Sequence, residues 1–287
     1  MFTLYTGGRS VVFEGTCLMT AVNITPDSFS DGGKFFEKDK AVKHALEALD
    51  KGADIIDIGG ESTRPGAARV SAPEEIRRVV PAVKEVIAAR PEALISVDTY
   101  KSAAAKAAVE AGAGIINDIS GGLFDPEMFE TAAAAGVSYV IMHIQGEPGN
   151  MQKAPSYSEK GVVSDIMSFF DERIKEAVKS GIKEEKIIID PGIGFGKTLK
   201  NNYEILNSLG EFRKFGRPVM AGVSRKSFIG GLVGKEPEKR IFGTAAAVAA
   251  SILKGADIVR VHDTEEMKDT AVICDAIKRP QSIKEAV

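Results

Sequence analysis

Eight short apolar segments, each followed by a stretch with helical patterning, restrict the fold of this chain more than any other feature. Apolar strands that alternate with helices in this way predict a parallel sheet buried on both faces. Eight such units close a (β/α)8 TIM barrel, which 287 residues can form as one domain, 1–287. The expected strands are Cys17–Asn23, Ala53–Gly60, Ala93–Thr99, Ala113–Ser120, Ser138–His143, Ile187–Ile193, Pro218–Ser224 and Ile258–Asp263.

Turn and cap residues support these boundaries. Ser71–Glu74 has the spacing of a capping box, and Asp125-Pro126 is typical of a helix start. Near the N-terminus, Phe2–Tyr5 and Val11–Phe13 flank a Gly-Gly pair and predict a β-hairpin that closes the bottom of the barrel. Several glycines stand where helices should stop, as left-handed C-caps do. They are Gly52, Gly112, Gly136, Gly181, Gly216 and Gly255.

Composition and charge exclude several classes of function. The net charge is -3 at pH 7 without a basic stripe, so nucleic acid is not an expected partner. The longest apolar run, Thr244–Leu253, is too short to span a bilayer, and the N-terminus lacks the pattern of a signal peptide. Cys17 and Cys274 stand in apolar contexts without metal-binding spacing, which predicts buried free thiols and a cytoplasmic location.

Polar side chains gather at the ends of the predicted strands, where barrels of this type carry their sites. Asp57, Asn117 and Arg260 each follow a cap glycine by five residues, so they should share one rung and point inward. Buried charges are unfavourable unless paired, so a purely structural network is one interpretation. The number of converging groups favours a functional site. The full set is Asn23, Asp57, Asp98, Asn117, His143, Asp190, Ser224, Arg225, Lys226, Arg260 and His262.

The residue types in this set indicate a ligand. Asp98, Asn117 and Asp190 offer acceptors to a flat, nitrogen-rich ring, since a carboxylate can take two parallel N–H bonds from such an edge. Lys226 can donate to a ring oxygen or nitrogen. Arg260 can stack on the ring or hold an anion, which lysine does less well.

The chain also offers groups for an anion and a metal. Asn23 supplies an oxygen suited to one position on a Mg²⁺ ion that keeps its waters and binds phosphate oxygens. The loop Asn23–Gly33 is rich in Gly, Pro, Ser and Asp and is expected to act as a lid. Among the histidines, His262 is the candidate for the anion site, whereas His44 is expected at the surface and His143 in a structural role.

The segment Gly192–Thr198 contains a Gly-Lys-Thr sequence like that of a phosphate-binding P-loop. That motif requires four residues before the Gly-Lys-Thr, and only three separate Gly192 from Gly196. An ATPase is therefore not expected. Phe195 in this segment either walls the ring or packs against a helix.

Longer motifs span nearly the whole chain in order. They are Asn23–Gly33, Asp57–Gly66, Val97–Lys101, Asn117–Gly121, Met142-His143 with Met151-Gln152, Asp190–Thr198, Ser224–Ser227 and Arg260–His262. Together they resemble the bacterial dihydropteroate synthase family. One departure is present: the family usually has a His-Asn pair after Lys197-Thr198, where this chain has Asn201-Asn202. That position begins a helix outside the ring pocket, so the expected activity is unaltered.

The resemblance implies a transferase of folate biosynthesis, the target of sulfonamides, that acts as a homodimer through its last helices. It would condense 6-hydroxymethyl-7,8-dihydropterin diphosphate with p-aminobenzoate and release diphosphate. Diphosphate would depart first, with help from Mg²⁺ and cations, and the neutral amine would trap the pterin-methyl cation. No strong base is then needed, in agreement with the lack of an obvious nucleophile–base pair in the sequence.

The family's site roles transfer to matching residues of this chain. Catalysis would rest on Asn23, which is also the Mg²⁺ ligand, and on Arg64, Lys226, Arg260 and His262. The pterin would contact Asp98, Asn117, Met142, Asp190, Phe195, Gly222, Lys226 and Arg260. The p-aminobenzoate and diphosphate would contact Thr63, Arg64, Ser227, Arg260 and His262, with the benzoate carboxylate near the start of the helix after Lys226.

Three competing functions fit parts of the same pattern. A pterin-binding methyltransferase of the corrinoid type shares the barrel and the pterin contacts. Methyl transfer needs no clamp for diphosphate or benzoate, so the Ser62–Pro65 loop and Ser224–Ser227 discriminate between the two activities. A non-catalytic pterin-binding paralogue is disfavoured by the intact set of site residues. A structural barrel would not need so many polar strand ends.

Overall fold

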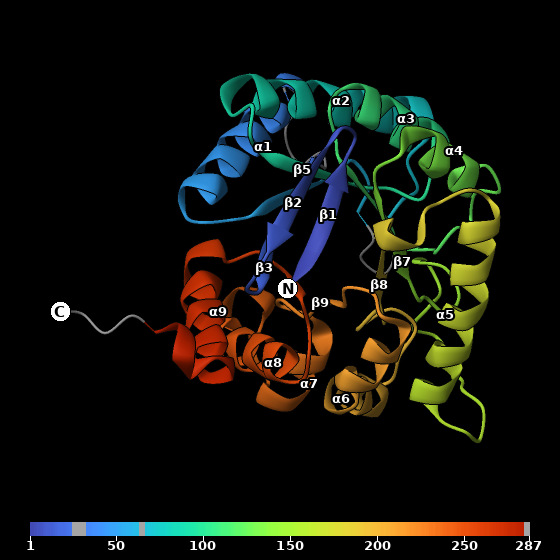
Figure 1. Cartoon of the computed structure of the whole chain (residues 1–287), viewed down its shortest axis with the longest axis vertical. Helices are drawn as coiled ribbons and strands as arrows, with labels where there is room; N and C mark the ends of the chain where they lie inside the picture. The colour runs from blue at the N-terminus through green and yellow to red at the C-terminus, as the bar shows by residue number, and fades with distance from the viewer. Residues whose placement is uncertain (25–32, 63–66, 284–287) are drawn as a thin grey trace.

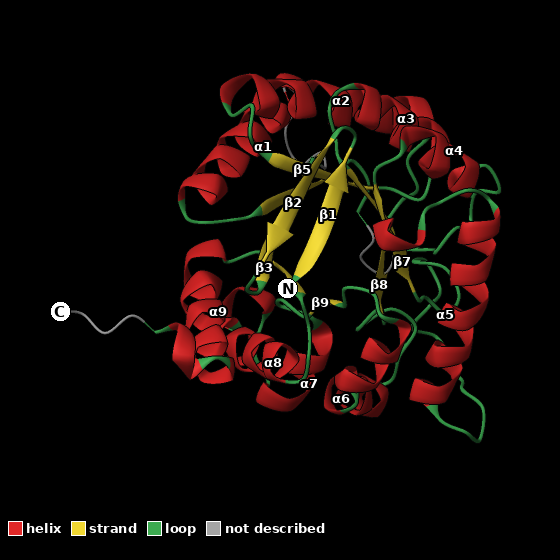
Figure 2. Cartoon of the chain, in the orientation of Figure 1, coloured by secondary structure: helices red, strands yellow, loops and turns green. Residues whose placement is uncertain are grey.

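The chain folds into a ring of parallel strands surrounded by helices, as Figure 2 shows. The computed structural model describes residues 1–24, 33–62 and 67–283. The barrel strands are β3 (Cys17–Asn23), β4 (Ile55–Gly59), β5 (Leu94–Asp98), β6 (Ile115–Asp118), β7 (Ser138–Met142), β8 (Ile187–Asp190), β9 (Met220–Gly222) and β10 (Ile258–Val261). The α-helices are α1 (Gly33–Asp50), α2 (Ala72–Ala89), α3 (Ser102–Glu110), α4 (Met128–Ala135), α5 (Val162–Lys179), α6 (Leu199–Asn207), α7 (Ser227–Val233), α8 (Ile241–Leu253) and α9 (Thr264–Lys278). Short 3-10 helices are η1 (Glu184–Lys186), η2 (Leu209–Phe215), η3 (Pro237–Lys239) and η4 (Pro280–Ser282).

The sheet closes into a barrel where its two ends meet. Its strands follow the order β8-β7-β6-β5-β4-β3-β10-β9. An isolated bridge between Ile189 and Val219 joins β8 to the start of β9, and the Ile189 N–H donates to the Pro218 carbonyl at 3.0 Å. All eight predicted strands are present, and the (β/α)8 prediction is confirmed.

The predicted hairpin closes one end of the barrel. The strands β1 (Phe2–Thr6) and β2 (Arg9–Phe13) pair antiparallel and lie across the opening of the ring (Figure 1). Leu4 is fully buried and packs with residues near the N-terminal ends of the barrel strands, among them Cys17 and Ile55. The polar residues lie at the opposite end of the barrel, where the strands end.

Strand alternation places apolar side chains against the helices. Ile56, Ile116 and Val259 are buried in one cluster with helix residues such as Val83 of α2 and Ala108 of α3. Each of the three stands next to a residue of the predicted polar rung. The period of two along each strand therefore separates a helix-facing core from the barrel interior.

Cap residues agree with the predictions at helix ends and agree in part at two helix starts. The predicted cap glycines all adopt positive φ, from 64° to 117°. Ser71 directly precedes α2, as predicted, but makes no side-chain cap bond, and Glu74 forms ion pairs along the helix with Arg77 and Arg78. The helix α4 begins at Met128 and not at Pro126. The Asp125 carboxylate accepts the Ser102 N–H at 2.7 Å at the start of α3, and it also accepts the Glu127 N–H at 3.0 Å just before α4.

The thiol and membrane expectations can also be compared with the structure. Cys17 and Cys274 are buried free cysteines, as predicted. Among the described residues, no helix has the length and apolar character that crossing a bilayer requires.

Candidate active site

A network of charged and amide side chains fills the C-terminal mouth of the barrel. Asp57 on β4 is fully buried and accepts hydrogen bonds from Asn117 Nδ2 at 3.0 Å and from Arg260 Nε at 2.6 Å. Arg260 also reaches across to β5, where its Nη2 donates to Asp98 Oδ2 at 2.8 Å. The five-residue spacing from the cap glycines therefore predicts the shared rung correctly.

Burial and mutual contact set the charges of this network. Burial lowers the pKa of Arg260, but Asp57 and Asp98 outweigh that effect and raise it, so the guanidinium stays charged. Burial raises the pKa of Asp98 to about 7, although Arg260 opposes the shift.

Several acceptors in this network are left without partners. Asp57 Oδ1, Asn117 Oδ1 and Ser96 Oγ are buried and have no hydrogen-bond partner among the described residues. An unsatisfied buried group is unfavourable by about 1–3 kcal/mol. The mouth of the barrel is therefore a site that a ligand with several N–H donors would complete.

A second group of polar residues comes from β8 and the loops after β8 and β9. The Gly192 N–H donates to Asp190 Oδ1 at 2.7 Å, and no described residue donates to the other carboxylate oxygen. Lys226 Nζ donates to the Ile193 carbonyl and lies 4.6 Å from the centre of the Phe195 ring. Burial raises the pKa of Asp190 and lowers that of Lys226 to about 8, while each residue opposes the shift of the other.

Glycines allow the segment after β8 to approach its neighbours closely. A Cβ at Gly192 would lie 1.9 Å from the His143 carbonyl oxygen, and one at Gly194 would lie 3.0 Å from Lys226 Cδ. Asn202 on α6 holds the segment, because its Oδ1 accepts the Gly194 N–H at 2.6 Å. This turn, hereafter the platform under Lys226, therefore packs closely against the Lys226 side chain.

The lysine of the Gly-Lys-Thr sequence is buried rather than offered to a phosphate. Lys197 Nζ pairs with His143 Nδ1 at 2.9 Å and donates to the Phe195 carbonyl at 2.9 Å. Burial, reinforced by the charge of Lys197, lowers the pKa of His143 to about 2. His143 is thus a neutral side chain held in the fold, in line with the structural role predicted for it.

An apolar cluster forms one wall of the mouth. Met142 and Met151 are buried together, and the half-buried Phe195 packs against them. Phe195 therefore belongs to the mouth of the barrel and not to a helix interface. Gly222 pairs with Arg260 in the sheet, and a Cβ there would lie 3.5 Å from Lys226 Nζ.

Of the residues expected to bind the anion, the metal and the benzoate, some lie within the described part of the chain and others do not. Asn23 is exposed at the end of β3, where its Oδ1 is 3.4 Å from the position a Cβ would take at Gly59. Ser227 is the first residue of α7. Thr63, Arg64 and most of the expected lid (residues 25–32) lie outside the described residues.

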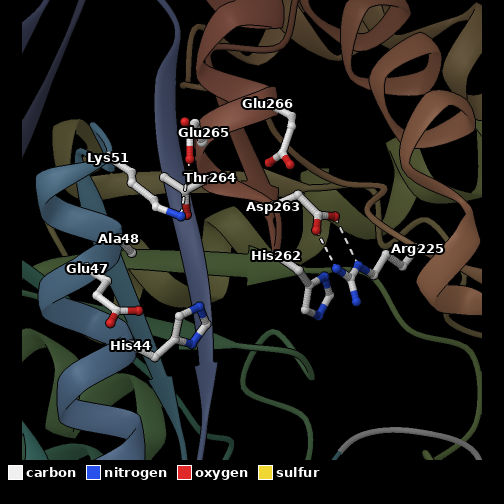
Figure 3. Close-up of a pocket in the computed structure, with 10 residues that line it drawn as sticks. All are labelled: His44, Glu47, Ala48, Lys51, Arg225, His262, Asp263, Thr264, Glu265 and Glu266. Atoms are coloured by element: carbon white, nitrogen blue, oxygen red, sulfur yellow. Dashed lines mark hydrogen bonds and ion pairs between the residues drawn. The ribbon is translucent and has the colours of Figure 1, made fainter.

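His262 lies at the rim of the mouth, directly after β10. Its backbone N–H donates to Ser224 Oγ at 3.2 Å, and its Nδ1 pairs with the same oxygen at 3.1 Å. It borders a pocket of about 280 Å³ between α1 and the start of α9, which the exposed His44 also lines (Figure 3). The structure therefore places His44 on the surface, as predicted, and His262 beside Ser224 at the strand ends.

Glu61 anchors the chain on the near side of the loop that carries Thr63 and Arg64. Its carboxylate accepts the Val70 N–H at 2.8 Å, the Tyr100 hydroxyl at 2.7 Å and Lys101 Nζ at 2.7 Å. These contacts join the two described ends of the loop to the segment after β5.

Several residues that support the site cannot be found by reasoning from the sequence. Glu61, Asn202 and Lys197 hold loops in this way, whereas Ser224, which holds His262, belongs to the predicted set. Only the Asn201-Asn202 departure carries a signal. Asn201 caps α6 together with Thr198, as expected for a helix start, whereas Asn202 contacts the platform under Lys226.

Comparison with known proteins identifies the family. The pterin binding enzyme family matches residues 19–262. The chain is 44% identical over 273 residues to dihydropteroate synthase of Escherichia coli (strain K12), which covers 95% of each chain. It is similar to the crystal structure of Yersinia pestis dihydropteroate synthase with a sulfonamide drug complex (TM-score 0.89, 42% identity, 96% of this chain and 99% of that one). It is also similar to dihydropteroate synthase from Xanthomonas albilineans in complex with 7,8-dihydropteroate (TM-score 0.86, 38% identity, 98% and 100%).

The family match and the barrel fold together define a pterin-binding barrel enzyme. Within that class, the identity over nearly the full length of both chains is decisive. The chain belongs to the dihydropteroate synthase family.

Proposed function

We propose that this chain condenses 6-hydroxymethyl-7,8-dihydropterin diphosphate with p-aminobenzoate to give 7,8-dihydropteroate and diphosphate, as one domain comprising residues 1–287. The observation that carries the proposal is the set of unpartnered buried acceptors at the barrel mouth, opposite a lysine. A pterin presents an amidine-like edge of N–H groups together with a ring carbonyl, which matches both features. The Xanthomonas albilineans relative is known in complex with the product, 7,8-dihydropteroate.

Each ring contact has a residue suited to it. The free carboxylate oxygen of Asp190 accepts from the amidine-like edge, and Asn117 accepts from a second ring N–H. Lys226 donates to the ring carbonyl. Arg260, whose guanidinium is held in one orientation by Asp57 and Asp98, lies against the ring face. Met142, Phe195 and Gly222 line the remaining surface.

The reaction needs little proton transfer from the protein. The C–O bond between the pterin methylene and diphosphate breaks first, and its electron pair leaves with diphosphate. The lone pair of the p-aminobenzoate nitrogen then forms the new C–N bond, and that nitrogen releases a proton to solvent. The carboxylates of Asp57 and Asp98 are engaged with Arg260, and His143 is buried against Lys197, so none of the three is placed as a strong base.

The departing diphosphate is assigned to Asn23, Arg64, Arg260 and His262. No cluster of three acidic, histidine or cysteine side chains within the described ranges could hold a metal without help. The exposed amide oxygen of Asn23 fits one position on an ion that takes its other oxygens from diphosphate and water. Bound Mg²⁺ would neutralise charge on the leaving group. A chelator should therefore stop product formation yet leave the binding of a pterin without diphosphate unchanged.

The p-aminobenzoate is assigned to Thr63, Arg64 and Ser227. Ser227 follows Lys226 directly, so the benzoate and pterin sites share one short segment. The amine would then approach the pterin methylene from the side of the α7 start.

A diphosphate-release assay tests the proposed reaction. With both substrates and Mg²⁺, we expect diphosphate and dihydropteroate in equal amounts. Without p-aminobenzoate, no dihydropteroate should form. Failure to release diphosphate with both substrates present would contradict the proposal and would favour the methyltransferase or the non-catalytic pterin binder.

We also propose a homodimer formed through the last helices, in the cytoplasm. The helices α8 and α9 expose several large apolar side chains, and an apolar surface of this kind marks an interface. They are Phe242, Leu253, Val272, Ile273 and Ile277. Light scattering should give the mass of two chains, and Ile273→Asp should give one. A wild-type monomer at micromolar concentration would contradict the dimer.

The proposed location in the cytoplasm rests on the thiols, because Cys17 and Cys274 are buried free cysteines and free thiols persist in a reducing compartment.

A further inference from the structure

Arg225 has a backbone conformation that is unusual for its residue type. Its φ is 57°, and no other non-glycine residue in the described ranges has a positive φ. It is the third residue of a four-residue turn, Val223–Lys226, which the Lys226 N–H closes to the Val223 carbonyl at 3.5 Å. A positive φ at this position of a turn favours glycine, because a Cβ crowds the backbone there. Something in the surroundings must hold an arginine in this shape.

Three contacts fix the residue in place. Its guanidinium forms a two-point ion pair with Asp263, in which Nε is 2.9 Å from Oδ2 and Nη2 contacts Oδ1 (Figure 3). Its N–H donates to Thr244 Oγ1 at 3.1 Å, and its carbonyl accepts from Arg240 Nη1 at 2.8 Å. Asp263 follows β10, and the other two partners lie at the start of α8. The turn after β9 is thereby tied to both of its neighbours.

The residues on either side of Arg225 are site residues. Ser224 holds His262 through its hydroxyl, and Lys226 points the other way, over Phe195 and toward the turn after β8. A change of φ at the residue between them would rotate one relative to the other. The left-handed turn therefore sets the directions of a lysine and of the hydroxyl that holds a histidine.

We propose that Arg225 and Asp263 are positioning residues, whose ion pair keeps the turn left-handed and so aims Lys226 into the pterin site and keeps Ser224 in contact with His262. This inference rests on the proposed function, because it assigns the pterin to Lys226. Neither Arg225 nor Asp263 needs to touch a substrate. Their effect passes through the backbone of the turn.

Substitutions that separate backbone shape from side-chain charge test this inference. Arg225→Gly removes the charge but allows the left-handed φ, whereas Arg225→Ala removes the charge and disfavours that φ. We expect the pterin KM to rise about threefold in the glycine variant and about tenfold in the alanine variant, with kcat changed less than about threefold in both. If Arg225 contacted the substrate directly, glycine and alanine would be equally poor, and that result would overturn the inference.

A double-mutant cycle tests the role of Asp263. Asp263→Ala should raise the pterin KM about tenfold in the wild-type background and less than about twofold in the Arg225→Gly background, because glycine needs no partner to keep the turn. An equal effect in both backgrounds would overturn the inference. Arg225→Lys, which keeps a cation but loses the two-point geometry, should fall between wild type and Arg225→Ala and serves if Asp263→Ala fails to fold.

The opposite end of the same strands offers a matched control. Arg213 forms an ion pair with Asp257 just before β10, in which Nη1 lies 3.1 Å from each carboxylate oxygen. Arg213→Ala should leave the pterin KM and kcat unchanged, and an equal loss there would overturn the inference. Pterin affinity is also measured by calorimetry. If the wild-type protein bound pterin but formed no dihydropteroate, the proposed reaction would be wrong. The ranking of the variants by pterin affinity would still decide the role of Arg225.

Discussion

Asp190 has one carboxylate oxygen that accepts a hydrogen bond within the fold and one that the proposed function assigns to the pterin. Its Oδ1 holds the Gly192 N–H, while the second oxygen has no described donor. Asp190→Ala should weaken pterin binding by about 2–4 kcal/mol, since a charged acceptor to buried N–H groups is lost. Calorimetry with a pterin measures the effect. Affinity within about threefold of wild type, or about 0.65 kcal/mol, would show that the carboxylate does not contact the ring.

The lowered pKa of Lys226 predicts how the activity depends on pH. Its pKa is lowered to about 8 by burial, so the ammonium is present below that pH and is lost as the pH rises through it. The kcat/KM for the pterin should therefore fall above about pH 8. Lys226→Arg should be less active, because the guanidinium has a different shape, but its profile should lack this decline.

The pH profile needs a control for folding. Lys226→Ala should give a wild-type circular dichroism spectrum, because residues at the mouth serve the site rather than the core. An unfolded alanine variant would show that Lys226 is structural. An unchanged alkaline decline in Lys226→Arg would assign the titration to another group.

At the scale of elements, the loop between β4 and α2 is anchored by Glu61. The carboxylate joins Val70 to Tyr100 and Lys101, and the loop carries Thr63 and Arg64. Glu61→Ala should reduce kcat/KM for p-aminobenzoate about tenfold and the affinity for a pterin much less, because the loop is assigned to the benzoate. Steady-state kinetics with each substrate varied in turn measures the difference.

Arg77→Ala is the control for the Glu61 variant. Arg77 pairs with Glu74 on the exposed side of α2, close to Glu61 in the sequence but without contact to the loop ends. It should leave both substrates unaffected. Equal losses for pterin and p-aminobenzoate in Glu61→Ala would point to a general loss of fold and not to the loop.

The positions of strand residues could be predicted from the sequence where their spacing from a cap glycine fixes them. Asp57, Asn117 and Arg260 could be placed on one rung because the cap glycines mark where each strand begins. Pairings between loops could not be predicted in the same way. Lys197 lies 54 residues from His143, and nothing in its neighbourhood indicates that a lysine there is buried.

The same limit applies to Arg225. Its partner Asp263 is 38 residues away and meets it only because β9 and β10 are neighbours in the closed sheet. The helix-start prediction at Ser71 gives the right residue without the cap bond, and that at Asp125 is two residues early for α4. The Asp125 carboxylate also accepts the N–H of Ser102, 23 residues away, and the local motif does not indicate that contact.

At the scale of the whole molecule, the barrel has one weakly joined pair of strands. β3 and β4 pair over five residues, from Met19–Ile55 to Asn23–Gly59, whereas β8 and β9 are joined by the isolated bridge at Ile189. Hydrogen exchange should therefore be faster in peptides 187–193 and 218–224 than in peptide 17–23.

Pterin should slow exchange in both peptides, because Asp190 and Gly222 lie on opposite sides of the β8–β9 junction. Mass spectrometry of the free and pterin-bound protein measures it, with peptide 17–23 as the internal reference. Equal protection of all three peptides in the free protein would contradict this view of the barrel.

The hairpin at the far end of the barrel has a consequence for how such a protein can change over generations. Leu4 and its neighbours in β1 and β2 pack far from the polar mouth, so substitutions there alter how much folded protein a cell holds and leave the chemistry alone. Substitutions at the mouth alter the chemistry directly, and they lower stability where they leave a buried polar group without its partner. A lineage under pressure from an inhibitor can therefore alter the mouth at some loss of folding and recover that loss by better packing beneath the hairpin, with neither change interfering with the other.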